Sequence, residues 1–296
     1  MKWNLIWLGL VFAILWSSAS AATKIALQSA QPFVIAVTRF FIAGLLMLIF
    51  AHGIKGYRMP RNKEWKQIMI YGLLNVSIYL GLYIISMQKI SAGLGTLAVA
   101  MNPVFISFMA AFIFKKPVGV KNIISLMLCF TGVFIAAYPL LKTSYAEFDG
   151  IVIMLTSMLA YSAGAIYYSR TNWNGLDIIT VNGWQTLLGG FFLLPVLFIT
   201  FKHTRNNFDF HFWSGTLWLA IPVSIGAVQC WMRLLKDNAA RASYWLFLCP
   251  VFGFIIAAVL LNEPLSLYTA AGVALVLIGL YSRNVSKEMV VTNIND

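Results

Sequence analysis

The two halves of this 296-residue chain carry the same pattern of residues, and this repeat restricts the fold to two related units. At a constant offset of 147 residues, the following segments align: Pro103-Val104-Phe105 with Pro250-Val251-Phe252, Ala110-Ala111 with Ala257-Ala258, Pro117 with Pro264, and Gly132 with Gly279. Upstream the offset is 145, and Ser17 aligns with Ser162. The repeat predicts one unit at residues 1–143, a second at 144–285, and a short polar tail at 286–296.

The composition of the chain indicates a membrane environment. Hydrophobic residues make up 60% of the chain and charged residues 10%, with a mean hydropathy of +0.82, whereas soluble domains carry about 25% charged residues. Apolar runs of about 20 residues recur, which is the length that a helix needs to cross a bilayer. Ten runs are predicted as spans: 4–24, 32–53, 66–87, 92–114, 120–140, 149–170, 177–201, 213–235, 239–261 and 267–284. The predicted fold class is an all-α integral membrane protein with ten transmembrane helices in two five-helix repeats.

The first apolar run has two interpretations. Its basic start and its small-residue end at Ala19-Ser20-Ala21 are typical of a cleavable signal peptide. The repeat favours retention, because Trp16-Ser17 aligns with Tyr161-Ser162 of an internal run. We expect this segment to stay as the first transmembrane helix.

The distribution of basic residues predicts the orientation in the membrane. With a cytoplasmic N-terminus, 15 of the 21 Lys and Arg residues fall in cytoplasmic segments and five fall outside; the remaining one, Arg39, lies within a span. Cytoplasmic loops of membrane proteins are enriched in Lys and Arg. The net charge of +12 therefore needs no nucleic-acid partner to explain it. The chain is predicted to be a multi-pass protein of the inner (plasma) membrane with both termini in the cytoplasm.

Five helices in each half make the second half start on the opposite side of the membrane from the first. The loop charges agree, because Lys115, Lys116 and Lys121 correspond to a loop that contains Glu263 and no Lys or Arg. Many secondary transporters use inverted repeats of this kind to alternate access to a site at mid-membrane. Transport is therefore the favoured function, although duplication also produces membrane proteins that transport nothing.

Several motifs together resemble the drug/metabolite transporter superfamily, of the EamA type. They are Trp16-Ser17-Ser18, Arg39 in the second helix, the run from Pro250-Val251-Phe252 to Leu261-Asn262-Glu263-Pro264-Leu265, and Gly272 and Gly279 in the tenth helix. The resemblance covers essentially the whole chain. It implies an inner-membrane carrier, often an exporter of amino acids or other small metabolites, with a central cavity between the halves. One departure is Lys115-Lys116-Pro117, where the family often places an acidic residue.

Arg39 is the clearest ionisable residue within a predicted span, and such residues are candidates for function. It lies seven residues beyond Pro32, or about 10 Å along a helix that rises 1.5 Å per residue. A guanidinium suits bidentate binding of a substrate carboxylate. The alternative is a structural role, in which the side chain reaches the outer interface or helix-end carbonyls. The resemblance favours this alternative, because the family often has an Arg here whatever its substrate.

Neutral polar and aromatic residues within the spans are the other candidates for substrate binding. Trp16 and Ser20 share a helix face, as do Asn75, Tyr79 and Tyr83 at four-residue spacing. The remaining predicted substrate-binding residues are Asn102, Tyr161, Gln185, Gln229 and Trp245. Thr96 and Asn182 are further polar residues in the spans. Each also has a structural interpretation, as an interfacial anchor or as a hydrogen bond between helices.

Other functional classes find little support in the sequence. No Asp or Glu lies near a span centre, so proton antiport on a buried carboxylate is disfavoured and facilitated exchange is favoured. Glu263 is expected to have a helix-end or loop role. HExxH and GxGD are absent, and Cys129, Cys230 and Cys249 lack CxxC spacing, so we predict no enzyme, catalytic residue, metal or cofactor. The expected partners are a small-molecule substrate and the bilayer, in a monomer or homodimer. Solute uptake and lipid flipping remain alternative functions.

Overall fold

The computed structural model describes residues 3–115, 120–143, 145–237 and 245–292, and its regular elements within those ranges are helices. The first half contains α1 (Trp3–Leu27), α2 (Pro32–Leu48), α3 (Lys63–Gly72), α4 (Tyr79–Ser86), α5 (Ala92–Ala100), α6 (Asn102–Ile113) and α7 (Val120–Leu141). The second contains α8 (Phe148–Arg170), α9 (Ile178–Thr200), α10 (Phe210–Trp218), α11 (Val228–Asp237), α13 (Leu248–Leu261) and α14 (Leu267–Thr292). A 3-10 turn covers His203–Arg205, and three π-helical segments cover Ile49–Ile54, Leu73–Ile78 and Leu219–Ala227.

The lengths and hydropathies of these helices define a membrane protein. Among the described residues, seven helices are long and apolar enough to span a bilayer. Helices α5 and α6 meet these criteria only when taken together, with a bend of 43° between them, and count as an eighth span if the pair crosses as one. Two shorter apolar helices, Leu248–Leu261 and Leu267–Tyr281, follow in the order of the last two predicted runs. The all-helical membrane class is therefore confirmed. Ten crossings in an inverted arrangement stay a prediction.

The predicted continuous helix over 92–114 is interrupted, which corrects the expectation from the sequence. The chain turns at Met101, and Pro103 occupies the first turn of α6. Proline has no N–H to donate to the carbonyl four residues earlier, and its ring clashes with that carbonyl, so it is stable at the start of a helix and not inside one. The bend follows from this one residue.

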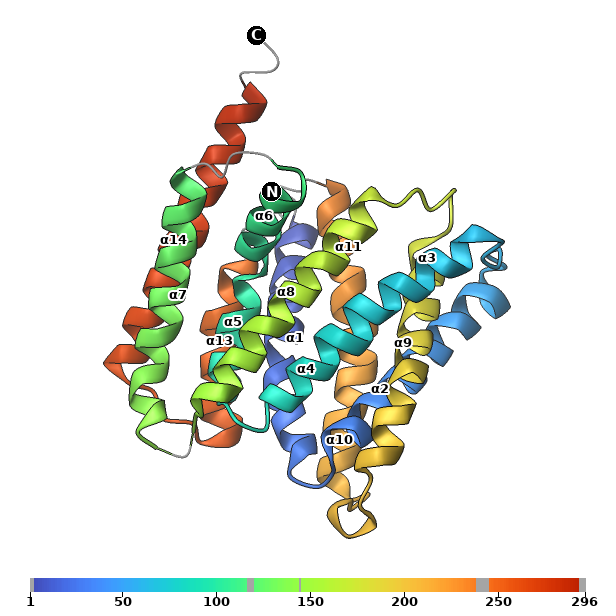
Figure 1. The fold of residues 1–296 in the computed structure, drawn as a ribbon, viewed down its shortest axis with the longest axis horizontal. Helices are drawn as coiled ribbons and strands as arrows, with labels where there is room; N and C mark the ends of the chain where they lie inside the picture. The colour runs from blue at the N-terminus through green and yellow to red at the C-terminus, as the bar shows by residue number, and fades with distance from the viewer. Residues whose placement is uncertain (1–2, 116–119, 144, 238–244, 293–296) are drawn as a thin grey trace.

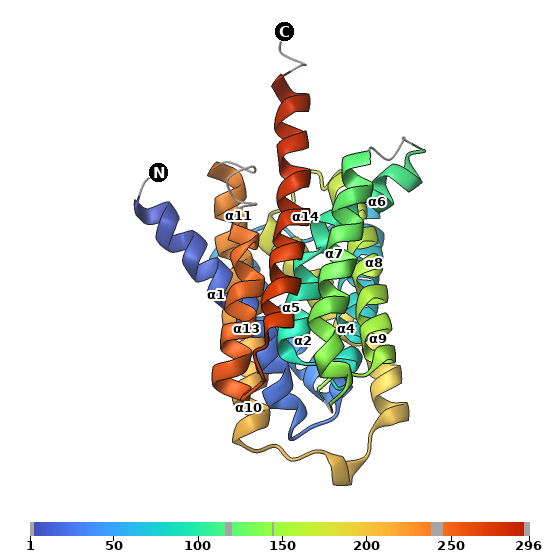
Figure 2. The same cartoon turned by 90° about the vertical axis from the view of Figure 1, so that its left-hand side faces the viewer.

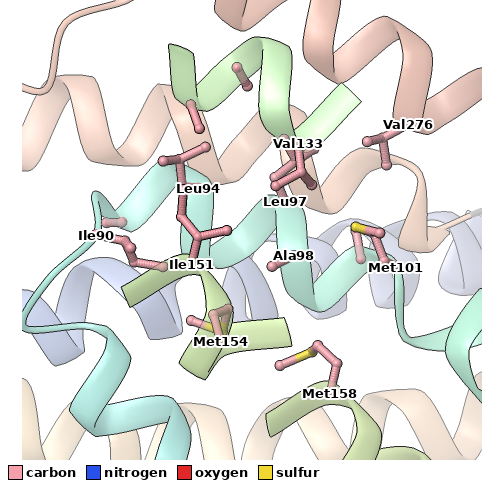
Figure 3. Close-up of a cluster of buried hydrophobic side chains, with 14 of the residues drawn as sticks. Ile90, Leu94, Leu97, Ala98, Met101, Val133, Ile151, Met154, Met158 and Val276 are labelled. Carbon is pink, nitrogen blue, oxygen red and sulfur yellow. The ribbon is translucent and has the colours of Figure 1, made fainter. Parts of the chain in front are cut away.

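A buried cluster of side chains surrounds α5 and joins it to both halves of the chain. Figure 3 shows Leu97 of α5 beside Val133 of α7 and Ile151 of α8 beneath Leu94. Helix α5 is buried around most of its circumference and is correspondingly rich in Ala and Gly. Small residues allow helices to approach closely in a bilayer, where apolar burial alone gives little net drive for association.

The helix pairs show a symmetrical pattern between the two halves. Helix α7 packs along α14, and α2 packs along α9, at opposite sides of the bundle (Figures 1 and 2). Helix α1 contacts α13 and α11, and α8, its counterpart in the repeat, contacts the equivalent helices α6 and α4. The start of α1 and the last turns of α14 lie toward the same end of the bundle (Figure 1), as an even number of crossings requires.

Candidate substrate-binding site

Two π-helical segments lie at the same 147-residue offset as the sequence repeat. Leu73–Ile78 separates α3 from α4, and Leu219–Ala227 separates α10 from α11. Both contain the triplet Val-Ser-Ile, as Val76-Ser77-Ile78 and Val223-Ser224-Ile225. A π-helical turn leaves the regular α-helical hydrogen-bond ladder and often marks a functional site. This triplet is the sequence signal that points to Ser224, which is not among the predicted substrate-binding residues.

A cavity of about 110 Å³ lies at the centre of the bundle, and both halves of the chain contribute to its wall. The wall comes from α1, α2, α4 and α5 of the first half, and from α9, the second π-helical segment and α11 of the second. The mixed origin of this wall makes the cavity sensitive to the position of one half relative to the other.

Five of the predicted substrate-binding residues line this cavity, namely Trp16, Ser20, Arg39, Tyr79 and Tyr83. The hydroxyls of Ser20 and Tyr83 share a hydrogen bond of 2.9 Å, which joins α1 to α4. The rings of Tyr79 and Tyr83 lie on one face of α4, with centroids 6.3 Å apart. The four-residue spacing thus places both rings on the cavity wall, and their role in substrate binding stays a prediction.

Two predicted residues, Asn75 and Gln185, support the wall from behind. The Asn75 amide donates to Gln185 Oε1 at 3.1 Å, and the Gln185 amide donates to Asn182 Oδ1 at 2.6 Å. Of these three side chains only Asn182 is part of the cavity wall. The chain of amides links the first π-helical segment to α9 and orients Asn182.

The other four predicted residues lie outside the cavity wall. Tyr161 packs against Tyr79 with ring centroids 4.9 Å apart, so it supports a residue of the wall. Asn102 is buried at the bend between α5 and α6, and its Oδ1 has no hydrogen-bond partner among the described residues. Gln229 is half-buried on α11, and Trp245 packs against Gly9 of α1.

The remaining polar residues of the wall are Thr96, Thr186 and Ser224, in addition to Asn182. Thr96 donates to the Ala92 carbonyl at 3.1 Å, one turn earlier on its own helix. Several apolar side chains, among them Phe40, complete the wall. The wall is thus mostly apolar and aromatic, with several hydroxyls and one amide.

Arg39 is buried, with 9% of its surface exposed, and it binds across the cavity to the opposite half of the chain. Its Nε and Nη2 donate to Ser224 Oγ at 3.1 and 3.0 Å. Ser224 Oγ in turn donates to the Leu219 carbonyl at 2.8 Å, five residues earlier in the π-helical segment. The guanidinium also lies 5.5 Å from the centroid of the Phe40 ring. No ion pair between described residues includes Arg39.

The end of the bundle at the α1–α2 connection, called the outer end here, is closed by bonds between the two halves. The buried Glu263 carboxylate, just beyond α13, accepts from the backbone N–H groups of Ala92 and Gly93 at 2.6 and 3.1 Å. It therefore caps the N-terminus of α5 and has the helix-end role expected from the sequence. At the same end, Ser29 donates to Asp209 at 2.9 Å, and the Gln31 N–H donates to Asn206 at 2.9 Å.

Two charged groups in the loops of the outer end have shifted pKa values. Hydrogen bonds from Lys89 to Asp149 and Glu147 raise the pKa of its ammonium to about 12. The backbone N–H of Phe212 and the Ser29 hydroxyl lower the pKa of Asp209, which caps α10. Both shifts stabilise the charged form of the group in the folded protein.

No group of three His, Cys, Asp or Glu residues within the described ranges is placed to hold a metal ion. The cavity wall contains no Asp, Glu, His or Cys among the residues the structure describes. The polar groups of the described wall are hydroxyls, one amide, one indole and one guanidinium, beside aromatic rings.

A bundle of long apolar helices around a central, mostly apolar and aromatic cavity defines the chain as a multi-pass membrane protein. The model of the EamA-like transporter family matches the chain twice, at residues 3–138 and 149–283, and the chain belongs to this family. The two matches cover the two halves of the repeat.

Relatives that align with most of this chain include proteins described as transporters. An uncharacterized transporter of Archaeoglobus fulgidus is 28% identical, over 95% of this chain and 97% of the relative. An uncharacterized transporter of Synechocystis is 24% identical, over 93% and 88% of the two chains. A chloroplastic WAT1-related protein of Arabidopsis thaliana is 26% identical, over 91% of this chain and 66% of its own length. These names indicate a transporter and not an enzyme.

One solved structure superposes on the chain with a TM-score of 0.68 and 16% sequence identity. The superposition covers 98% of this chain and 99% of the solved one. At this level of identity the likeness concerns the fold alone.

Proposed function

We propose that this protein is a secondary transporter that moves small organic metabolites, amino acids or similar compounds, through the central cavity. The observation that carries the proposal is the wall of that cavity, in which Arg39 of the first half and Ser224 of the second are joined by hydrogen bonds. A site shared between two halves changes its shape when they move relative to one another. This property is what alternating access requires.

The contacts of the bundle support such a movement. Packing of α1 on α13 has its counterpart at the repeat offset in α8 on α6, and packing of α3 on α9 has its counterpart in α10 on α2. Related arrangements of the two halves can therefore have similar packing. Glu263 and Asp209 hold the outer end together by bonds between the halves. We propose that these bonds break when the site opens outward, and that ten crossings in two inverted repeats provide the second arrangement.

We place the transporter in the inner membrane with both termini in the cytoplasm, and we propose export as its direction. The excess of Lys and Arg in the segments assigned to the cytoplasm supports the orientation. Because the cavity wall has no carboxylate among its described residues, exchange down a solute gradient explains the transport better than proton antiport on an acid.

Counterflow in proteoliposomes tests the proposal. Vesicles loaded with unlabelled solute are expected to accumulate the labelled solute from a panel of amino acids and related acids, with and without a pH gradient. The panel also reveals the coupling, since proton antiport makes accumulation depend on the gradient. Absence of counterflow for the whole panel would contradict the proposed function, and rapid movement of labelled lipid instead would favour a flippase.

A matched pair of variants links counterflow to the cavity. Val99 is part of the cavity wall, and Val99→Phe should fill the site and abolish counterflow. Val259 lies on the outer surface of α13 with 72% of its surface exposed, so Val259→Phe makes the same change against lipid and should retain transport. Equal activity of both variants would place the transport route elsewhere.

A further inference from the structure

We infer, on the basis of the proposed transport function, that the substrate of the central cavity is a small organic acid with a single negative charge. Its carboxylate binds the guanidinium of Arg39, and its apolar part lies against Trp16, Tyr79 and Tyr83. Among the small organic metabolites of the proposed function, this assignment favours monocarboxylates without an ammonium group over amino acids.

The first argument is the charge of the cavity. Among the described residues of its wall, Arg39 is the only one with a charged side chain. The tyrosine hydroxyls of the wall are neutral at pH 7. A buried charge is costly unless it is paired, and no described carboxylate pairs with Arg39. A monoanion makes the occupied cavity neutral, whereas a dianion leaves one negative charge unpaired.

The second argument is the supply of hydrogen-bond donors. A guanidinium has five N–H donors in a planar fork that matches a carboxylate. Two of the five N–H groups of Arg39 donate to Ser224 Oγ, which leaves three for a ligand. Ser224 is fixed by its own bond to the Leu219 carbonyl, so it acts as a positioning residue for the guanidinium.

The third argument is the absence of an anionic partner for an ammonium group in the described wall. The polar side chains there besides Arg39 are hydroxyls and an amide, and several are already engaged, as in the pair Ser20 and Tyr83. Bound as a zwitterion, an amino acid brings one positive charge for each negative one, so the charge of Arg39 stays uncompensated. An amino acid, and still more a simple amine, should therefore bind more weakly than the matching acid.

The test is a set of three ligands that share a phenylalkyl group and differ in charge. They are 3-phenylpropanoate (monoanion), phenylalanine (zwitterion) and 2-phenylethylamine (cation). A second, smaller aliphatic set has the same three charges: 4-methylpentanoate, leucine and 3-methylbutylamine. Titration calorimetry on the purified full chain at pH 7.5 measures their affinities. In at least one set, we expect the acid to bind at least tenfold more tightly than the amino acid, and the amine to show no binding.

Variants of Arg39 separate its charge from its shape. Arg39→Gln should lose most of the affinity for the acid, and Arg39→Lys should retain part of it, because the charge remains without the fork. Arg61→Gln is the matched control, since Arg61 is an exposed loop residue outside the cavity and should leave the affinity unchanged. The ratio of acid to amino-acid affinity is measured on the unaltered protein, so it decides the question even where Arg39→Gln fails to fold.

The outcomes for substrate class and for transport are distinct. Amino acids that bind as tightly as the acids, no binding by either acid, or an Arg39→Gln variant that keeps full affinity would each overturn the monocarboxylate assignment. Counterflow of leucine or phenylalanine without counterflow of the acids would do the same and leave the transport function standing. No counterflow with any solute, together with tight binding of the acids, would overturn transport and keep the binding site.

Discussion

Ser77 and Ser224, which are 147 residues apart, occupy equivalent places in two π-helical segments, and each hydrogen-bonds to the second helix of the opposite half. Ser77 Oγ donates to the Gly189 carbonyl of α9 at 2.9 Å. Ser224 Oγ accepts from the guanidinium of Arg39 on α2. The two halves thus use the same residue in the same backbone geometry, but only one of the two serines meets a charged side chain.

This difference gives the cavity its chemical character. Ser77 is buried and uses its hydroxyl hydrogen to bond the Gly189 carbonyl of the neighbouring helix, so it has no hydrogen left to donate to a ligand. Ser224 orients a guanidinium that keeps further donors toward the cavity. The repeat therefore builds the frame from both halves, and the departure from the repeat at Arg39 makes one wall cationic.

Close packing of α7 against α14 predicts a strong effect of a single methyl group. A Cβ added at Gly132 would lie 2.6 Å from the Gly272 carbonyl oxygen, which is backbone and cannot turn aside. Gly132→Ala should lower the stability by about 1–3 kcal/mol, the usual cost of overpacking. Thermal unfolding in detergent measures the loss. Gly53→Ala is the control, because nothing lies within 4 Å of its added Cβ; equal melting temperatures for the two variants would contradict the packing.

The cap on α5 predicts a cost for removing the Glu263 carboxylate. In Glu263→Ala the N–H groups of Ala92 and Gly93 lose their acceptor in a buried place, which should cost about 1–3 kcal/mol. Glu263→Gln keeps one acceptor oxygen, so its melting temperature should lie between those of Glu263→Ala and the unaltered protein. The exposed Glu147 pairs with Lys89 at the same end, and Glu147→Ala should change the melting temperature little. A larger shift for Glu147→Ala than for Glu263→Ala would refute the cap.

The lowered pKa of Asp209 predicts that the protein loses stability at acidic pH. Asp209 has its pKa lowered in the folded protein, chiefly by the N–H of Phe212 and also by the Ser29 hydroxyl. Its stabilisation is therefore fully present above the ordinary aspartate pKa of about 3.9, and it is lost as the pH falls through the lowered value. Melting temperatures of the unaltered protein and of Asp209→Asn, measured from pH 7 to pH 3, should converge below pH 4. A difference that stays constant over this range would show that the charge of Asp209 contributes nothing.

The proposed orientation predicts the accessibility of single cysteines. In a chain whose native cysteines are replaced, a cysteine at Arg61 or Lys63 should react with an impermeant maleimide from the cytoplasmic side alone. A cysteine at Lys202 should react from the outside alone. All three positions are exposed, so the side of the membrane decides the labelling. Right-side-out and inverted vesicles compare the two sides, and labelling of all three from one side would refute the orientation.

Helical periodicity brings part of the predicted stripe to the cavity wall and stops doing so at an identifiable place. Tyr79 and Tyr83 lie on α4 at a spacing of four residues and do face the cavity together. Asn75 has the same spacing from Tyr79, but it lies in the π-helical segment Leu73–Ile78. A π-helical turn holds more residues than an α-helical one, so the stripe does not continue through it. Asn75 instead bonds to Gln185, behind the wall.

The sequence by itself determined the membrane environment, the helical class and the repeat, because length, hydropathy and composition act locally along each span. It also placed Arg39 at a depth where a charge needs a partner. Only the tertiary structure decided which partner that is, since Ser224 lies 185 residues away along the chain. Contacts between distant helices depend on how whole surfaces pack, and residue spacing carries no information on that. The repeat can be recognised in the sequence, whereas the cavity forms only where the two halves of the chain pack together.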